Sequence, residues 1–268
     1  MKAADVFRTL AAIRARAPLV HNITNLVVTN TTANALLAIG ASPAMVEASD
    51  EVEAFARVSD ALVVNLGTLT SPQAAAIKLA VAAAVSAGKP WVLDPVAVGA
   101  IAYRTGIAHQ LLACRPTAIR GNASEILALA GEAGAGRGVD SAAGAEAALG
   151  SARVLAERTG AAVAITGATD YVTDGTRVAT VGNGHPMMTR VTGLGCTATA
   201  ILGACAAVES DGLAAAAHAL TILGVAGEIA AERARGPGSL QMEILDALYA
   251  LDEETLNRRA RLAMEDTE

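Results

Sequence analysis

Aromatic residues are nearly missing from this sequence: they make up 2% of its 268 residues. Proteins that bind single-stranded nucleic acid stack the bases on aromatic side chains and follow the backbone with clustered cations. This chain offers neither feature, since it contains no basic run and its formal net charge is −6. We therefore expect no nucleic acid and no anionic membrane among its partners.

Cysteine and long apolar runs are also scarce. The three cysteines, Cys114, Cys196 and Cys205, are odd in number and lack the spacing of a metal site. No stretch approaches the roughly 18 uninterrupted apolar residues that suit a membrane span. Residues Met1–Arg16 have the pattern of an amphipathic helix rather than that of a signal peptide. These absences lead us to expect a reduced, soluble protein of the cytoplasm.

Hydrophobic residues, in contrast, are abundant in this chain. Hydrophobic residues make up 53% of it and charged residues 17%, so a large core is available at this length. No linker divides the sequence, and the Gly/Ala-rich stretch Gly131–Gly144 is interpreted as a surface connection rather than a boundary. We predict a single domain over residues 1–268.

Short apolar runs alternate with longer helical patterns along the chain. Strands that are apolar throughout, with helices between them, indicate an α/β fold with a central, mostly parallel sheet that has helices on both faces. Ligands bind beyond the carboxyl ends of such strands, so we expect the chemistry there. The predicted strands of this part are Leu19–Ile23, Ala44–Val46, Ala61–Asn65, Trp91–Leu93, Thr117–Ile119 and Ala162–Thr166.

The rest of the chain contains a turn signal and several helical patterns. Asp174-Gly175 is a typical hairpin turn, and the residues beyond it become mainly helical. The elements predicted here are a β-hairpin of Tyr171–Thr173 and Arg177–Thr180, three or four helices from Cys196 to about Leu251, and a solvated terminal helix over Glu253–Asn257 and Arg258–Arg261.

The segment Val191–Ala198, with the sequence VTGLGCTA, leads directly into a predicted helix. Its two glycines allow a tight turn with exposed N–H groups, and a helix N-terminus adds partial positive charge, which together suit a phosphate. An ordinary glycine turn before a helix has the same pattern, because G-x-G alone is a weak signal. At this place the helix N-terminus is expected to lower the pKa of the Cys196 thiol.

Three further segments place polar residues after predicted strands. Arg120 is a cation that suits phosphate oxygens, and Glu125 is a carboxylate that suits magnesium, although Asn122 and Glu125 also have the spacing of a helix capping box. Asp94 ends an apolar strand, where it either joins Glu125 in holding Mg²⁺ through water or forms a turn before Pro95. Thr166, followed by glycine, either meets a nucleotide phosphate or makes a turn.

Taken in order, these segments resemble the ribokinase-like kinases. That family has D-P after one strand, N-x-x-E after the next, T-G after a third, and a G-x-G motif that opens a helix. The N-terminal third narrows the resemblance to the hydroxyethylthiazole kinase family, and the likeness covers nearly the whole chain. The matching segments are Pro18–Asn25 (PLVHNITN), Thr29–Asn34 (TNTTAN), Gly40–Met45 (GASPAM), Trp91–Gly99 (WVLDPVAVG) and Asp170–Gly175 (DYVTDG).

The resemblance implies a ribokinase-like α/β domain and a homotrimer with active sites between subunits. It also implies transfer of the γ-phosphate of ATP to 4-methyl-5-(2-hydroxyethyl)thiazole with Mg²⁺, in thiamine biosynthesis or salvage. The residues that match the family's sites are Met45, Gly193 and Asn25 for the substrate, Arg120, Thr166 and Gly195 for ATP, Asp94 and Glu125 for magnesium, and Cys196 for catalysis.

Cys196 departs from the broader ribokinase-like pattern, which has an aspartate acting as base at this position. Cysteine is known there in thiazole kinases, so we interpret Cys196 as a modest general base or proton acceptor. The alternatives are a hydroxymethylpyrimidine kinase, and an ATP-dependent dehydratase of the same fold, which would carry the aspartate. A Rossmann oxidoreductase would need G-x-G-x-x-G near the first strand, and that motif does not occur there.

Overall fold

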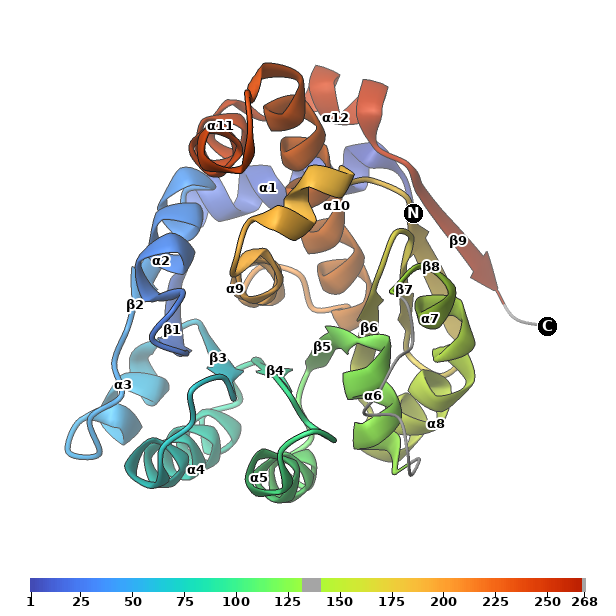
Figure 1. Ribbon diagram of the computed structural model, residues 1–268. Coiled ribbons are helices and arrows are strands. Elements are labelled where there is room, and N and C mark those ends of the chain that lie inside the picture. Colours follow the sequence, from blue (N-terminus) through green and yellow to red (C-terminus); the bar gives the residue numbers. More distant parts are fainter. Residues whose placement is uncertain (132–140, 267–268) are drawn as a thin grey trace.

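A sheet of apolar strands forms the centre of the fold (Figure 1). The computed structural model describes residues 1–131 and 141–266, and within them nine strands form one sheet in the order β2-β1-β3-β4-β5-β6-β7-β8-β9. The first six in that order run parallel, which confirms the predicted mostly parallel sheet. They are β2 (Ser42–Ala44), β1 (Leu19–Ile23), β3 (Ala61–Asn65), β4 (Trp91–Asp94), β5 (Ala118–Asn122) and β6 (Ala162–Thr166).

The last three strands in that order are antiparallel. The predicted hairpin is present as β7 (Asp170–Thr173) and β8 (Arg177–Val181). The strand β9 (Leu262–Asp266) was not predicted: it pairs with β8 after the terminal helix α12 (Glu253–Arg259) has ended. Local pattern does not mark β9 as a strand, because it forms on the open edge that β8 presents.

Helices cover both faces of the sheet, as predicted, and each face has its own apolar core. Neighbouring side chains of a strand point to opposite faces, so Val63 joins one core while Leu62 and Val64 join the other. One face carries α1 (Ala3–Arg16), α2 (Thr29–Ala38), α9 (Leu194–Ala206), α10 (Gly212–Arg233), α11 (Pro237–Ala250) and α12; the other carries α3 (Val52–Val58), α4 (Ser71–Ser86), α5 (Ala102–Leu112), α6 (Ala123–Ala130), α7 (Ser141–Ala147) and α8 (Leu149–Thr159).

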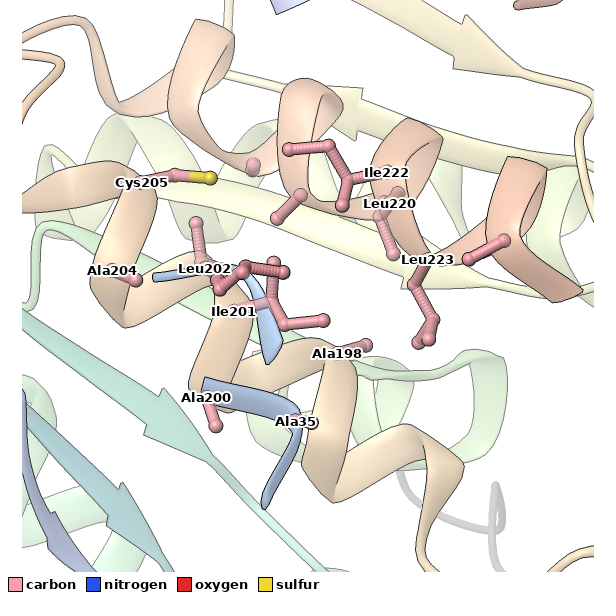
Figure 2. Packing of buried hydrophobic residues seen from close by; sticks show 14 of the residues in the cluster. Ala35, Ala198, Ala200, Ile201, Leu202, Ala204, Cys205, Leu220, Ile222 and Leu223 are labelled. Atoms are coloured by element: carbon pink, nitrogen blue, oxygen red, sulfur yellow. The ribbon is translucent and has the colours of Figure 1, made fainter. Parts of the chain in front are cut away.

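Helix α10 is long and apolar enough to cross a membrane, with a mean hydropathy of 1.6, but 83% of that window is buried inside the protein. Figure 2 shows the reason: Leu220, Ile222 and Leu223 of α10 pack beside Ile201 and Leu202 of α9. Close packing against α9 explains the apolar composition of α10, which is a core helix of this fold.

Several predicted strand boundaries were wrong: β4, β7 and β8 each differ by one residue, and two other strands differ by more. The second strand is Ser42–Ala44 rather than Ala44–Val46, because it pairs with the first residues of β1 and leaves the ladder at Ala44. The fifth runs on to Asn122, so Arg120 lies inside the strand, opposite Ala164 of β6. The surface connection predicted over Gly131–Gly144 falls largely outside the described residues.

The strand order reverses between β1 and β3. From β1 the chain passes through α2 to β2 on one side, and then through α3 to β3 on the other side of β1. Such a reversal opens a crevice beyond the carboxyl ends of the two central strands. The residues at those ends are Asn65, which closes β3, and Asn25, which follows β1.

Candidate active site

A chain of buried polar side chains joins the carboxyl ends of three strands. Asn25 Nδ2 donates to Asn65 Oδ1 at 2.9 Å, and Asn65 Nδ2 donates to Asp94 Oδ2 at 2.7 Å. Thr199 Oγ1, from α9, donates to the same Asp94 oxygen at 2.8 Å. The network therefore connects β1, β3, β4 and α9, and it holds the Asp94 carboxylate in one orientation.

Asp94 is nearly fully buried, with 1% of its surface exposed. Burial raises its pKa to about 6, helped by the charge of Glu125, whereas the Arg120 cation and the hydrogen bonds from Thr199 and Asn65 oppose the rise. Its second oxygen, Oδ1, is buried and has no hydrogen-bond partner among the described residues. A buried oxygen of this kind fits a cation, or a water held by a cation.

The turn before α9 is shaped by two glycines. Gly193 has φ +83°, and a Cβ atom there would lie 2.4 Å from Val28 Cγ1. A Cβ atom on Gly195 would lie 2.5 Å from Arg120 Nη1. The guanidinium of Arg120 therefore lies directly against the first turn of α9, where its charge adds to that of the helix N-terminus and suits an anion.

Cys196 lies in that first turn. Asn25 Nδ2 approaches its Sγ at 3.4 Å. The expected lowering of the thiol pKa was wrong: burial, and then the charge of Asp94, raise it to about 11, despite hydrogen bonds from Asn65 and Asn25 and the nearby Arg120 charge. Desolvation of the thiolate outweighs the helix N-terminus here, so the thiol is protonated at neutral pH.

Arg120 and Thr166 lie on neighbouring strands. Arg120 Nη2 donates to Thr166 Oγ1 at 2.5 Å, and the hydroxyl in turn donates to the Gly121 carbonyl at 3.3 Å. Arg120 Nε is buried and finds no acceptor in the part of the chain that the structure describes. The side chain thus keeps hydrogen-bonding capacity that an anionic ligand can use.

Glu125 is engaged on both carboxylate oxygens. Oε2 accepts from the Asn122 N–H at 2.9 Å, and Asn122 Oδ1 accepts from the Glu125 N–H at 2.9 Å, which is the capping box that the spacing allowed. Oε1 accepts from the Ala97 N–H at 2.9 Å. Glu125 therefore ties α6 to the loop that follows Asp94.

A cavity of about 450 Å³ opens beside these groups. Three residues predicted for ATP lie on its wall, namely Arg120, Thr166 and Gly195. Most of the other residues that line the cavity were not singled out in the sequence analysis. They include Asp170, Asn183, Gly184, His185, Pro186, Met188, Thr189, Leu220 and Leu223.

The residues predicted for the substrate lie elsewhere. Asn25 is joined to Cys196 through its amide, and Gly193 packs on Val28 beside them. Met45 is half-buried directly after β2, at the sheet edge next to β1, and the following carbonyl, that of Val46, accepts from His21 Nε2 at 2.7 Å. None of these substrate residues lines the cavity, so the first turn of α9 separates two groups of predicted site residues.

Asp170 is a titratable wall residue that the sequence analysis did not single out. It begins β7, is 9% exposed and accepts from the Gly167 N–H at 2.9 Å. Burial raises its pKa to about 6, against the Gly167 hydrogen bond and the Arg120 charge. The only sequence signal for Asp170 was its position three residues after Gly167, and that spacing also fits an ordinary turn.

Replacing Asp170 with asparagine should change how stability depends on pH. Between about pH 4 and about pH 6, folded Asp170 keeps a proton that the unfolded chain has released, so its contribution to stability falls as pH rises through this window. Asparagine does not titrate. The free energy of unfolding of D170N relative to the unsubstituted protein should therefore rise by about 1 kcal/mol from about pH 5 to about pH 8, measured by urea denaturation.

Asp174, in the hairpin turn, is the matched control for that measurement. Its burial acts to raise the pKa, but hydrogen bonds from Arg177 and Thr176 outweigh this and lower it to about 2. Its contribution is complete above the ordinary value of 3.8 and is lost only as pH falls toward 2, so D174N should show a flat difference over the tested range. A flat difference for D170N would contradict the raised pKa.

Comparison with known proteins gives a consistent result. The model of the hydroxyethylthiazole kinase family matches residues 10–254. The hydroxyethylthiazole kinase of Granulibacter bethesdensis is 68% identical over 252 residues, which cover 94% of this chain and 92% of that protein. The solved structure of hydroxyethylthiazole kinase from Pyrococcus horikoshii has a TM-score of 0.91 and 42% identity, and the match covers 97% of this chain and 99% of that one.

A more distant structure bears on the fold alone. A ribokinase-like superfamily protein from Enterococcus faecalis matches with a TM-score of 0.61 at 11% identity, over 92% of this chain and 88% of that one. The predicted ribokinase-like α/β fold is thereby confirmed. With the family model spanning most of the chain and a relative at 68% identity, this protein belongs to the hydroxyethylthiazole kinase family.

Proposed function

We propose that this protein transfers the γ-phosphate of ATP to the hydroxyl of 4-methyl-5-(2-hydroxyethyl)thiazole in thiamine biosynthesis and salvage. One observation carries the proposal: the first turn of α9 lies between the cavity, which Arg120 and Thr166 line, and the side chain of Asn25. A triphosphate in the cavity and an alcohol beside Asn25 would meet at this turn. Phosphoryl transfer depends mainly on such positioning and on charge stabilisation.

On the nucleotide side, Arg120 and Thr166 would bind phosphate oxygens, and the Gly195 N–H would donate to them. Magnesium, when bound, would neutralise phosphate charge. The buried, unpaired Asp94 Oδ1 fits this ion or its water. Glu125 would add negative charge from the same side, although both of its oxygens already accept backbone N–H groups.

Few protein ligands would be needed for this ion. Across residues 1–131 and 141–266, no three His, Cys, Asp or Glu side chains gather as a metal site. Magnesium is commonly bound by one or two carboxylates together with water and substrate phosphates. That mode agrees with a site that is complete only when the nucleotide is present.

On the alcohol side, Asn25, Gly193 and Met45 would contact the thiazole. The two residues after Asn25, Leu26 and Val27, are 76% and 61% exposed. Two adjacent large apolar side chains with this exposure fit a surface that a partner covers. We propose that the protein is a cytoplasmic homotrimer in which a second subunit covers these two side chains. Each active site would then be completed between two subunits.

Cys196 would stand beside the reacting hydroxyl. With a pKa of about 11 the thiol is protonated at neutral pH, so it orients the hydroxyl rather than removing its proton beforehand. The hydroxyl oxygen bonds to the γ-phosphorus, the bond to the leaving ADP oxygen breaks, and the proton departs late, to a phosphoryl oxygen or to water. A loose transition state tolerates a weak base.

Substitutions of Cys196 test this role. C196A should lower kcat about tenfold by removing the partner of the hydroxyl, and C196D should recover part of the loss because a carboxylate can accept the proton. Steady-state kinetics near neutral pH would measure both. C114A is the control, since Cys114 lies beside Trp91 at the amino ends of β4 and β5, the ends opposite to the site. Unchanged kcat in both Cys196 variants would contradict the proposed role of Cys196 in the reaction.

The activity itself is tested by coupled ADP release with purified protein. The thiazole alcohol should support ADP formation that depends on Mg²⁺, with a higher kcat/KM than hydroxymethylpyrimidine. Hydrated nicotinamide cofactor is the third substrate to compare, because an ATP-dependent dehydratase of this fold would consume it. Preference for the pyrimidine or for the hydrated cofactor would overturn the assignment.

A further inference from the structure

One wall of the cavity is a loop that follows β8. Residues Asn183–His185 and the short 3₁₀ helix η1 (Pro186–Arg190) supply Asn183, Gly184, Met188 and other lining residues. This wall contributes no strand to the sheet. Its position therefore depends on the side chains that hold it from behind.

Helix α10 lies close behind that wall. A Cβ atom on Gly224 would lie 2.7 Å from Asn183 Cβ, and one on Gly227 would lie 2.3 Å from Met188 Sδ. Beside this close contact, Glu228 reaches the loop with a side chain that is 14% exposed. Its Oε1 accepts from Asn183 Nδ2 at 3.1 Å and from the Gly184 N–H at 2.9 Å.

Arg261 holds the same loop from the segment before β9. Its side chain pairs with Glu228, and its Nη2 and Nε donate to the Gly182 carbonyl at 2.6 and 3.0 Å. Its backbone N–H donates to Asn183 Oδ1 at 2.7 Å, and its carbonyl accepts from the Gly182 N–H at 2.8 Å. Neither Glu228 nor Arg261 lines the cavity.

We propose that Glu228 and Arg261 are positioning residues for the nucleotide: through the loop at Asn183 and Gly184, they hold the cavity wall in its binding shape. The inference rests on the proposed binding of ATP in this cavity. The bonds from Glu228 and Arg261 end at the loop and do not extend to Asn25, Met45 or Cys196. Nucleotide affinity is therefore separable from the affinity for the alcohol.

The variants E228Q and R261M test the proposal. E228Q keeps one acceptor oxygen for the loop but loses the charge and the second oxygen that face Arg261, and R261M removes the bonds to Gly182 and Glu228. Each variant should therefore raise KM for ATP about tenfold. KM for the thiazole alcohol and kcat should stay near those of the unsubstituted protein. Because both act on one loop, the double variant should lose little more than the larger single loss.

Glu232 provides a matched control one turn further along α10. Among the described residues its carboxylate bonds only the side chain of Arg259, at 2.6 and 3.0 Å, whereas Arg259 contacts the loop through its backbone carbonyl, which accepts from Asn183 Nδ2. E232Q should therefore leave KM for ATP unchanged. Arg261 is 56% exposed, so R261M should fold even if E228Q does not, which circular dichroism and thermal melting would establish. Lysine at position 261 should restore part of the affinity lost in R261M.

The outcomes separate the two proposals. Unchanged KM for ATP in folded R261M and E228Q, with an active unsubstituted enzyme, would overturn the positioning role alone. An equal rise in E232Q would overturn it too, because it would indicate a general effect of charge on α10. An unsubstituted protein that does not phosphorylate the alcohol would contradict the proposed function itself.

Discussion

Replacing Asp94 with asparagine is expected to lower kcat about a thousandfold while the protein becomes more stable at neutral pH. The variant keeps an oxygen for Asn65 and Thr199, but it loses the negative charge and the unpaired carboxylate oxygen, Oδ1. In our proposal that oxygen serves magnesium and the transferring phosphoryl group. Kinetics at saturating substrates, over a series of Mg²⁺ concentrations, would measure the loss.

The expected gain in stability follows from the raised pKa of Asp94. Folded Asp94 retains its proton up to about pH 6, whereas an unfolded aspartate releases it near 3.8. Its contribution to stability therefore falls as pH rises between these values, and above about pH 6 the buried charge destabilises the folded state. Asparagine carries no charge, so the melting temperature of D94N should exceed that of the unsubstituted protein at neutral pH.

A second aspartate serves as the control for D94N. Asp60 lies at the opposite, amino end of β1, where its carboxylate accepts from the Leu19 N–H at 2.8 Å. D60N should keep kcat within about twofold of the unsubstituted enzyme, in line with substitutions away from special features. The role of Asp94 would be contradicted if D94N retained most of its kcat at any Mg²⁺ concentration.

Replacing Arg120 with methionine should lower kcat/KM for ATP by about a thousandfold. Its guanidinium lies on the cavity wall, against the turn at Gly195, and bonds Thr166. Methionine keeps most of the apolar stem and removes the charge. Lysine should restore part of the loss, because it keeps the charge but not the planar pair of donors. Initial rates over a range of ATP concentrations would measure each variant.

The pH dependence of the activity of R120M is a second, independent test of the role of Arg120. The Arg120 charge lowers the pKa of both Asp94 and Asp170 against their burial. Without it both carboxylates should bind protons more tightly, so the acidic limb of the residual activity should move to higher pH. R57M is the control, because Arg57 is exposed on α3 and contacts Ser86. An unshifted limb together with unchanged KM for ATP would contradict the role of Arg120.

Much of the sheet was predictable from local pattern. The bounds of β1, β3 and β6 match those predicted, because each is a short apolar run between clear breaks. The order of motifs from Asp94 to Cys196 predicted a ribokinase-like protein, and the N-terminal segments narrowed this to the hydroxyethylthiazole kinase family, which the comparisons confirm. Local pattern failed for β9, since its pairing with β8 depends on a partner about 80 residues away in the chain.

The candidate site was predictable only in part. Arg120, Thr166 and Gly195 were placed together by family resemblance, and the structure brings them to one cavity. Asp170 and Asn183 were not singled out, because each sits in a sequence that also fits an ordinary turn or loop. Their place on the wall follows from how β7 and the loop after β8 fold toward α10.

Composition, periodicity and motif order thus determine which kind of sheet forms, which family the chain joins and which residue types carry its chemistry, because these follow from short stretches of chain. Tertiary structure decides the state of those residues. The Cys196 thiol is the clearest example: its helix N-terminus favours a lowered pKa, yet burial and Asp94 raise it. Desolvation and charge act through space, between groups that only the folded chain brings together.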